Sequence, residues 1–464
     1  MTAHVPTLVV GAGISGLVCA YALRNAGVDV QIIESSATPG GVIRSERRDG
    51  YLLEFGPQSF NATSAVLKLC RELNIDDQLV EAPANAPRYV LVNGSLQPVP
   101  LSPLAFIASS LFGPVTKLRV LRDILGRSSP PQSDESVAAF TRRKFSRELL
   151  DKLVGPFVSG IYAGDPEKLS LRSAFPQLYE AEKTAGSVIR GLLFSAKKRA
   201  ASAEKPTLQT FREGNQTLIH TLATNLGSNL RCGVTVQSVG FTTASRGSRT
   251  DTSIFEVTLT ANDREETLTA NRLIIATPAE QAATLLRGVD PQFESALMPI
   301  AYAPVAVVSL GYAKSAIRRL LDGFGFLVPR SSGLRILGSV WNSSLFPNRA
   351  PDGHVLLTSF VGGATDPGAK PLSEVEIVSI VHRELATVVG ISQPPSFSHV
   401  QAWQRAIPQY NLGHVQHINQ LAQLQSKHQS IRLIGNYLRG PALGACVEQA
   451  LTLAQEAIKK DRAT

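Results

Sequence analysis

The sequence predicts an α/β fold in which a nucleotide-binding domain is assembled from the two ends of the chain. Three observations lead to this prediction. A glycine-rich turn between a predicted strand and a predicted helix lies near the N-terminus, from Leu8 to Ala26. A second strand, glycine and helix unit lies at the far end, from Ile431 to about Lys460. Between them a mainly helical stretch gives way to alternating strand patterns, which indicates further domains.

The N-terminal unit has the layout of a dinucleotide-binding motif. The apolar run Leu8 to Val10 leads into a G-x-G-x-x-G turn and a helix, and a second strand from Val28 to Ile33 ends on the acid Glu34. The first glycine permits the turn, the second lets the backbone approach a pyrophosphate, and the third lets the helix pack on the sheet. The positive helix N-terminus favours the pyrophosphate, and Glu34 is placed to bind a ribose. We expect diphosphate contacts at Gly11, Gly13, Ile14, Ser15 and Gly16, and ribose contacts at Glu34 and Ser35.

Composition indicates a globular protein of two or three domains. The chain has 464 residues, of which 44% are hydrophobic. Four widely separated cysteines form no C-x-x-C pair, so we expect neither a metal site nor a disulfide framework. No apolar run reaches the roughly 18 residues that span a bilayer. The first strand follows Met1 so closely that we expect no cleaved presequence.

The net charge of +9 is concentrated in one segment. Between Leu101 and Lys205 there are 17 Lys or Arg residues and 10 Asp or Glu residues, an excess of +7. No nucleic-acid motif accompanies it, so we expect no nucleic-acid partner. The same segment begins with the apolar stretch Leu101 to Phe112, which Lys117, Arg119 and Arg122 follow. This pattern fits an interfacial membrane element with a basic flank, and it fits a buried helix with a solvated end equally well.

Further elements follow from hydrophobic periodicity and turn residues. A helix is expected from Thr63 to Leu73, and a strand from Tyr89 to Val92 with a hairpin turn at Asn93-Gly94. Residues 101 to 205 are expected to be mainly helical, with a loop-rich interruption around Gly155 to Pro166. Strands are expected at Val234 to Val239, Ile254 to Leu259, Leu273 to Ala276, Val305 to Tyr312, Leu334 to Val340 and Val355 to Phe360, and helices after Thr277-Pro278 and from Val375 to Val389.

Several segments together carry a family resemblance. Pro39 to Ser45 (PGGVIRS) directly follows the acid, an arrangement that resembles the flavin amine-oxidase superfamily, where this loop runs along the FAD diphosphate. An ordinary turn is the alternative. Gly155 to Pro166 (GPFVSGIYAGDP) is far more specific. With this segment, Thr358 to Gly363, Gly323 to Pro329, Ala406 to Tyr410, Gly413-His414 and Gly435-Asn436, the chain resembles the oxygen-dependent protoporphyrinogen IX oxidases over essentially its whole length.

The resemblance implies three domains around a non-covalently held FAD. Residues 1–87, 207–290 and 400–464 would form a Rossmann-like FAD-binding domain. Residues 88–100 and 291–399 would form a mixed α+β substrate domain, and residues 101–206 a mainly helical domain that docks on a membrane. The reaction would be the penultimate step of haem synthesis: six electrons leave a porphyrinogen in three flavin cycles, with oxygen as acceptor and hydrogen peroxide released. A membrane-docked enzyme can receive this poorly soluble ring without releasing it into water, which favours the interfacial interpretation of Leu101 to Phe112.

The resemblance also places cofactor contacts outside the glycine turn. Gly41 and Arg44 would complete the diphosphate loop, and the backbone of Val234 would meet adenine, although Val234 would also suit a plain strand core. Gln58 stands where many family members have Asn, which could alter how the substrate is steered. Pro441 departs from the family pattern but suits the first turn of a helix. The remaining contacts are expected at Gly56, Pro57, Gln58 and Ser59 near the flavin ring, and at Asn436, Pro441, Ala442 and Leu443.

Substrate contacts are expected on one predicted hairpin and its neighbours. Arg88 matches the family arginine that binds a substrate propionate, because a guanidinium offers a carboxylate two parallel hydrogen bonds. A solvated arginine is the alternative. Phe324, Gly325 and Leu327 would sandwich the macrocycle, and Phe360 would contribute nearby; plain core is the alternative for these residues. No His, Glu or Cys constellation stands out as a general base. This is consistent with the chemistry, because the flavin can accept a hydride once the substrate is positioned. The scattered histidines have no metal spacing and are expected to be structural.

Other functions remain open from sequence. Coproporphyrinogen III is the alternative substrate, and its additional propionates would favour a more basic pocket. An amine oxidase or a carotenoid desaturase would lack the segments at Gly155 to Pro166 and Gly323 to Pro329. A flavin-binding protein that only delivers porphyrins is a further alternative. The resemblance implies a peripheral membrane surface, a homodimer and handover to ferrochelatase as partners. We expect the cytoplasmic face of a bacterial membrane, or the cytoplasm, rather than the mitochondrial inner membrane.

Overall fold

Two seven-stranded sheets dominate the computed structural model, which describes residues 3–200, 207–242 and 254–463. The first sheet has the order β10-β2-β1-β13-β12-β11, and β19 pairs with β13. Strands from both ends of the chain share this sheet, because β1 and β19 both run parallel to β13. Its strands are β1 (Ala3–Val10), β2 (Val30–Ile33), β10 (Leu230–Arg231), β11 (Val234–Phe241), β12 (Phe255–Ala261), β13 (Arg264–Ile275) and β19 (Ile431–Leu433).

The central strands of the first sheet are apolar on both faces, and helices cover each face. Val9 packs in one core cluster, whereas its neighbours Leu8 and Val10 pack in another. This alternation is the expected arrangement for parallel strands that are buried on both sides. The helices whose residues join the Val9 cluster are α1 (Ile14–Asn25), α2 (Ser64–Glu72), α11 (Gln216–Leu226) and α17 (Leu443–Ala463). Those that join the other cluster are α12 (Ala279–Leu286), α13 (Pro291–Leu297) and α16 (His414–Lys427).

The second sheet has the order β18-β14-β17-β16-β15-β7-β8. Helix α15 (Glu374–Val389) covers one face, and a capping box formed by Ser373 and Glu376 fixes its start. The domain boundary expected at residue 400 falls inside β18, which pairs with β14, so residues up to Pro408 belong to this sheet. The strands are β7 (Arg88–Val92), β8 (Ser95–Pro98), β14 (Tyr302–Ala313), β15 (Gly325–Leu327), β16 (Ile336–Trp341), β17 (His354–Gly362) and β18 (Phe397–Pro408).

The third unit is helical. Its expected loop-rich interruption is wrong for the first eight residues, because Gly155–Tyr162 forms helix α7 with Pro156 in the first turn, where proline is tolerated. Residues 201–206 of this expected domain lie outside the described residues. The other elements are α3 (Pro103–Ala108), α4 (Pro114–Leu125), α5 (Val137–Lys144), α6 (Arg147–Leu149), the π-helix η2 (Leu150–Val154), α8 (Leu171–Ala174), α9 (Pro176–Ala185) and α10 (Val188–Ala200).

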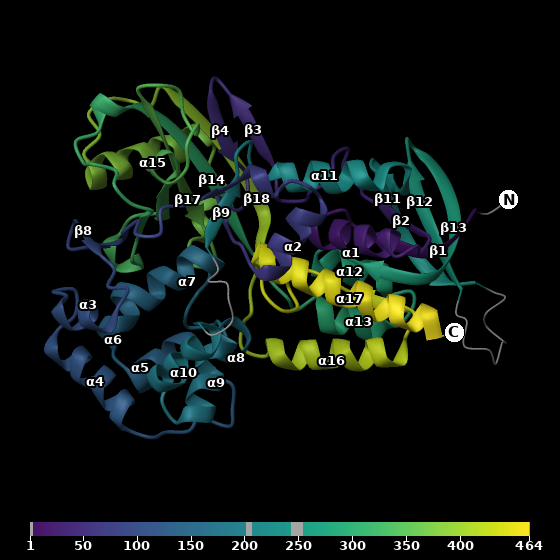
Figure 1. Ribbon diagram of the computed structural model, residues 1–464, viewed down its shortest axis with the longest axis horizontal. Helices are drawn as coiled ribbons and strands as arrows, with labels where there is room; N and C mark the ends of the chain where they lie inside the picture. The colour runs from purple at the N-terminus through teal and green to yellow at the C-terminus, as the bar shows by residue number, and fades with distance from the viewer. Residues whose placement is uncertain (1–2, 201–206, 243–253, 464) are drawn as a thin grey trace.

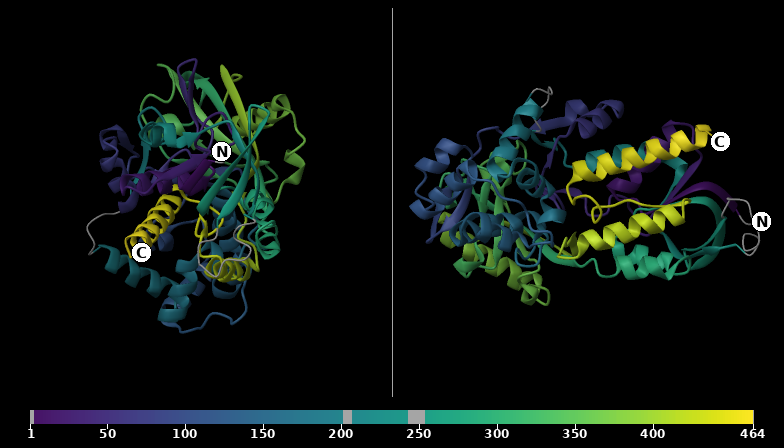
Figure 2. Two further views of the ribbon diagram at one scale, coloured as in Figure 1. Left: turned by 90° about the vertical axis from the view of Figure 1, so that its right-hand side faces the viewer. Right: turned by 90° about the horizontal axis from the view of Figure 1, so that it is seen from below.

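The three units meet near the middle of an elongated molecule. In Figure 1 the first sheet and its helices lie on the right, the second sheet at upper left and the helical unit at lower left. In the right-hand view of Figure 2 the first sheet and its helices lie at the right, and the other two units overlap at the left. Two small sheets link the units: the hairpin β3 (Ser45–Arg48) and β4 (Tyr51–Glu54), and β5 (Phe60–Asn61) with β9 (Leu208–Phe211) and β6 (Leu79–Glu81). Every helix within the described ranges is too short or too polar to cross a bilayer.

Candidate active site

The glycine turn after β1 has the geometry that its three glycines predict. Gly11 has φ +99° in the turn from β1 to α1, and its N–H donates to Ile33 O at 2.7 Å, which continues the parallel pairing of β1 with β2. A Cβ on Gly16 would lie 1.9 Å from Gly11 O, so only glycine allows the helix to approach this closely. A Cβ on Gly13 would have no neighbour within 4 Å. The backbone at Gly13 is therefore open to a ligand, beside Ile14 and the buried Ser15 at the start of α1.

The acid after β2 is tied to this turn. Glu34 is 9% exposed; its Oε2 accepts from Ala12 N–H at 2.7 Å, and its Oε1 accepts from Ser36 N–H at 2.9 Å. Ser35 Oγ also lies 3.4 Å from Oε1. Val234 joins this end of the site, because its N–H donates to Glu34 O at 3.0 Å. Each carboxylate oxygen retains acceptor capacity, so the geometry allows Glu34 to accept further hydrogen bonds from a ribose.

The loop after β2 lies directly against the glycine turn. Gly40 N–H donates to Ala12 O at 2.8 Å, and a Cβ on Gly41 would lie 3.6 Å from Gly13 Cα. The Arg44 guanidinium lies over the Phe55 ring, 5.5 Å from its centroid. The structure thus brings Gly13 and Gly41 together at the α1 N-terminus, where the helix dipole favours an anion. Arg44 follows on the same loop, and its side chain is exposed.

The C-terminal unit approaches the same region. Tyr410 Oη donates to Asn436 O, and His414 stacks on the Tyr410 ring with centroids 4.3 Å apart. His414 is 4% exposed, and burial lowers its pKa to about 4. Helix α17 begins at Leu443, so Pro441 and Ala442 precede it, and the expected place of Pro441 in the first turn is wrong by two residues. The helix pairs closely with α1 in the Val9 core cluster.

Hydrogen bonds from two side-chain amides, those of Gln58 and Asn342, hold the segment Gly56 to Ser59. Gln58 Nε2 donates to Glu54 O at 2.9 Å and to Gly56 O at 3.1 Å, so its Oε1 must be the acceptor. Asn342 Nδ2 donates to that oxygen at 2.7 Å. Asn342 is 2% exposed, and its own Oδ1 has no partner among the described residues. A Cβ on Gly56 would lie 2.2 Å from Val42 O, so this segment also packs against the loop after β2.

A buried ion pair fixes three segments around this site. Glu54 and Arg349 are each 2% exposed, with Oε1 and Nη1 3.5 Å apart. Glu54 also accepts from Ser45 Oγ at 2.6 Å and from Asn215 N–H at 2.9 Å. Burial raises the pKa of Glu54 to about 7, against the lowering effect of Arg349. Sequence reasoning missed Glu54, Arg349, Asn215 and Asn342. A glutamate within the apolar strand Tyr51–Glu54 was the available signal.

Strand register places the expected substrate residues on one face of the second sheet. Arg88 pairs with Gly325, and Leu327 pairs with Gly338, which in turn pairs with Phe360. Residues in register point to the same face, so Leu327, Gly338 and Phe360 lie side by side on it. The Leu327 side chain lies over Gly338, because a Cβ on Gly338 would be 3.3 Å from Leu327 Cδ2. Helix α7 packs directly on this face, because a Cβ on Gly160 would lie 2.6 Å from Leu327 Cδ2. The opposite face, with Tyr89 and Phe326, packs on α15.

The edge of this face carries a cation. Arg88 is exposed, and its guanidinium lies over the Phe324 ring, 5.5 Å from the centroid. Gly325 has φ +128°, and a Cβ there would lie 2.0 Å from Ser339 O, so only glycine fits. The structure brings Arg88, Phe324, Gly325 and Leu327 together at β7 and β15. Phe360 lies two strands away and packs with Ala163 and Leu337.

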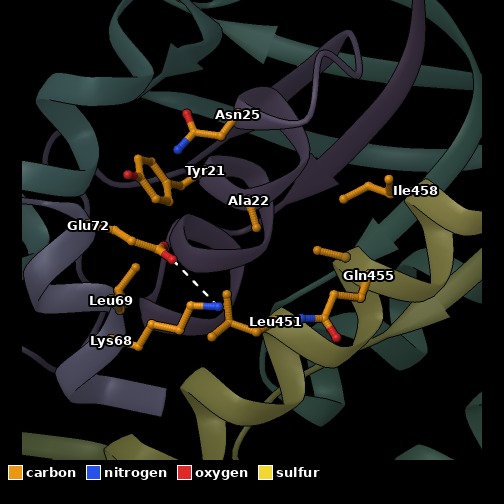
Figure 3. Close-up of a pocket in the computed structure, with 10 residues that line it drawn as sticks. Tyr21, Ala22, Asn25, Lys68, Leu69, Glu72, Leu451, Gln455 and Ile458 are labelled. Atoms are coloured by element: carbon orange, nitrogen blue, oxygen red, sulfur yellow. Dashed lines mark ion pairs between the residues drawn. The ribbon is translucent and has the colours of Figure 1, made fainter. Parts of the chain in front are cut away.

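A separate cavity of about 190 Å³ lies between α1, α2 and α17 (Figure 3). Tyr21, Leu69 and Leu451 line it, and Lys68 and Glu72 form an ion pair of 3.8 Å at its wall. It adjoins the C-terminal half of α1, away from the glycine turn that precedes this helix. The cavity is therefore distinct from the site described above.

Comparison with known proteins identifies the family. The model for flavin containing amine oxidoreductases matches residues 14–458. The chain belongs to this family. A chloroplastic protoporphyrinogen oxidase of Nicotiana tabacum is 36% identical over 478 residues, which cover 98% of this chain and 85% of the relative. Coproporphyrinogen III oxidase of Bacillus subtilis (strain 168) is 30% identical over 471 residues, which cover 97% of each.

A solved structure gives the same fold. A crystal structure from Exiguobacterium sp. 255-15 has a TM-score of 0.80 at 23% identity, and covers 99% of this chain and 100% of its own. Together with the family match, these relatives make the protein an FAD-dependent oxidoreductase. The residues present fit that cofactor, because the open backbone at Gly13 and the acid Glu34 lie where a dinucleotide needs them.

Proposed function

We propose that this flavoprotein oxidises protoporphyrinogen IX to protoporphyrin IX, the penultimate step of haem biosynthesis, with oxygen as acceptor. Six electrons and six hydrogens leave the substrate, and three O₂ become three H₂O₂. The observation that carries the proposal is the apolar face of the second sheet with Leu327, Gly338 and Phe360, on which α7 packs and which Arg88 flanks. We call the proposed porphyrinogen site on this face the slot. The names of the two relatives, which act on porphyrinogens, support the same class of substrate.

The binding residues act by position. FAD would lie with its diphosphate on Gly13, Gly41 and Arg44, its ribose on Glu34 and its ring beside Gly56 to Ser59, where it supplies a hydride acceptor. Leu327 and Phe360 would supply apolar contacts to the macrocycle and exclude water from it. Arg88 binds a propionate through two parallel hydrogen bonds. Fixing the macrocycle in this way can provide a large part of the rate enhancement.

The scarcity of cations on this face favours protoporphyrinogen IX over coproporphyrinogen III. In register with Arg88 and Leu327, the same face presents Val90, Val340 and Phe360, which are all apolar. Two additional propionates would need further cations there, because an unpaired buried carboxylate is costly. Vinyl groups have no such requirement. The main alternative is the oxidation of coproporphyrinogen III, the reaction for which the Bacillus subtilis relative is named.

The test compares the two substrates side by side. Purified holoenzyme is mixed with each porphyrinogen under air, and porphyrin fluorescence is followed with time. We expect a higher kcat/KM for protoporphyrinogen IX. Equal or higher efficiency with coproporphyrinogen III would replace the proposed substrate, and no fluorescence with either would overturn the oxidase assignment.

We further propose that the helical unit docks on the surface of a membrane, at the cytoplasmic face of a bacterial cell. Leu104 on α3 is 80% exposed, and Leu118 on α4 is 66% exposed. The basic residues Lys117, Arg119 and Arg122 lie on the same helix as Leu118. An apolar surface with a basic flank is typical of proteins that bind anionic lipid. Among the described side chains of this unit, the other exposed large apolar residues are Leu101, Ile107, Val115, Leu121, Leu125, Phe157, Ile161, Leu193 and Phe194.

A further inference from the structure

A polar cavity of about 210 Å³ lies between the β7–β8 hairpin and the helical unit. Asn93, Ser95 and Gln97 line it from the hairpin, and Ser110 and Lys152 line it from the helical unit. These side chains supply amide, hydroxyl and ammonium donors. A cavity with several donors and one cation fits a small anionic group. It lies outside the slot formed by Leu327, Gly338 and Phe360.

Lys152 is held with part of its ammonium free. Its Nζ donates to Leu111 O at 2.8 Å and to Glu148 Oε1 at 2.7 Å, and its side chain is 31% exposed. An ammonium has three N–H donors, so one remains for a ligand. Lys152 lies in the π-helix Leu150–Val154, and such turns are frequent at functional sites.

The cavity lies at the base of the exposed helix α3. The chain enters α3 after Gln97 and leaves it at Ser110, so lining residues flank both ends of this helix. Leu104 and Ile107 on α3 are 80% and 64% exposed. An interfacial helix inserts its apolar face about 5–10 Å into the headgroup and acyl boundary. If α3 inserts, its base reaches the level of the lipid phosphates.

We propose that this cavity binds the phosphate of a membrane phospholipid, with Lys152 as its cation. The inference rests on the proposed docking of the helical unit. Glu148 shares the Lys152 ammonium and also accepts from Gly113 N–H at 3.0 Å and Thr116 Oγ at 2.6 Å. This neighbouring carboxylate disfavours a doubly charged phosphate monoester. The singly charged phosphodiester of a lipid such as phosphatidylglycerol is the better match.

The test separates headgroup binding from membrane insertion. Dihexanoyl phosphatidylglycerol, kept below its micelle concentration, is titrated calorimetrically into full-length holoenzyme. We expect one saturable site in the parent protein and a loss of affinity of about tenfold or more in Lys152→Gln, because a charge-assisted hydrogen bond is removed. Lys117→Gln, which removes a charge from α4 outside the cavity, is the matched control and should bind as the parent does. Gln97→Ala, which leaves the Lys152 contacts intact, should weaken binding to a smaller extent.

Each other outcome contradicts the proposal. Absence of saturable binding, or equal affinities for the parent and a Lys152→Gln protein with unchanged Tm, would overturn the site. Inorganic phosphate that binds as tightly as the short-chain lipid would replace a lipid site by a phosphate site. A Leu104→Ser, Ile107→Ser double variant should lose vesicle binding while it retains the short-chain lipid. Vesicle binding thus measures membrane docking, and titration with the short-chain lipid measures the headgroup site. Porphyrinogen turnover in detergent tests the proposed enzymatic function separately from both.

Discussion

Asn342 donates its side-chain amide to Gln58 Oε1 at 2.7 Å, which joins the second sheet to the segment expected beside the flavin. Asn342 directly follows β16, whereas Gln58 follows β4. Gln58 in turn donates to two backbone carbonyls, so the chain of amides has only one consistent direction. Residues far apart in sequence thus fix the conformation of Gly56 to Ser59.

We predict that Asn342→Ala destabilises the protein by about 1–3 kcal/mol, because Gln58 Oε1 is left buried without a donor. Chemical denaturation of the apoprotein measures the change. Asn225→Ala is the control, since the Asn225 amide makes an exposed hydrogen bond to Thr221 O. Equal midpoints for the two variants would show that the amide chain contributes nothing.

Gly13 and Gly16 should respond differently to alanine. In Gly16→Ala the new Cβ meets Gly11 O at 1.9 Å, so we expect a loss of about 3 kcal/mol of folding stability. In Gly13→Ala the Cβ enters open space, so the fold should keep its Tm while FAD affinity falls about tenfold or more. Flavin fluorescence titration and thermal unfolding separate the two effects. Gly240→Ala, which also meets no atom within 4 Å, should change neither.

Arg88→Ala should impair substrate use and leave FAD bound. Its guanidinium contacts Phe324 at the edge of the slot and is otherwise exposed, so truncation removes a propionate partner at little cost to the fold. We expect kcat/KM to fall about tenfold, mostly through KM. The exposed Arg383→Ala is the matched control. Parent-like kinetics in Arg88→Ala would remove Arg88 from the site.

His414 should make stability depend on pH in mildly acidic solution. Its folded pKa is lowered to about 4 from 6.5, so the unfolded chain binds a proton first as the pH falls. Stability is therefore complete above pH 6.5 and is lost progressively between pH 6.5 and 4, by about 3 kcal/mol. His414→Gln should flatten this part of the curve, whereas the exposed His220→Gln should not. The same slope in both variants would assign the dependence to other groups.

Leu104→Ser combined with Leu118→Ser should reduce binding to anionic vesicles by about tenfold, because two exposed apolar side chains no longer insert. Turnover in detergent should stay unchanged, since both residues lie on α3 and α4, outside the slot. Vesicle sedimentation is the measurement. Val375→Ser on α15, where Val375 is 79% exposed, serves as control. If this control reduces binding as strongly, the helical unit is not the docking surface.

Local patterns predicted the elements that depend on local chemistry. The glycine turn at Gly11 to Gly16, the hairpin turn at Asn93-Gly94 and the helix expected from Val375 to Val389 all match the structure, because turn residues and 3.6-residue periodicity act over short distances. The helix α7 was missed because its glycines and proline resemble loop composition, although a proline in a first helical turn is tolerated. Strand β18 was missed because polar and apolar residues both occur at its exposed positions and at its partly buried positions. No regular alternation of polar and apolar residues therefore marks it in the sequence.

Only the site residues that belong to recognisable sequence motifs could be predicted. Gly13, Glu34 and Arg88 stand in recognisable patterns, so sequence could name them. Asn342 donates to Gln58, 284 residues away, and Arg349 donates to Thr210 Oγ1, 139 residues away, besides pairing with Glu54. No local spacing indicates such contacts. The placement of Leu327 beside Phe360 likewise depends on the register of three strands, which sequence periodicity does not define.

The central claim is that the slot holds a porphyrinogen for complete oxidation beside FAD. Its most direct test is the ratio of hydrogen peroxide released to protoporphyrin IX formed, measured with purified holoenzyme and protoporphyrinogen IX in air-saturated detergent. Three peroxide molecules per porphyrin are expected, with the flavin spectrum restored at the end. If the flavin stays oxidised and no hydrogen peroxide is released while substrate is present, the central claim is wrong.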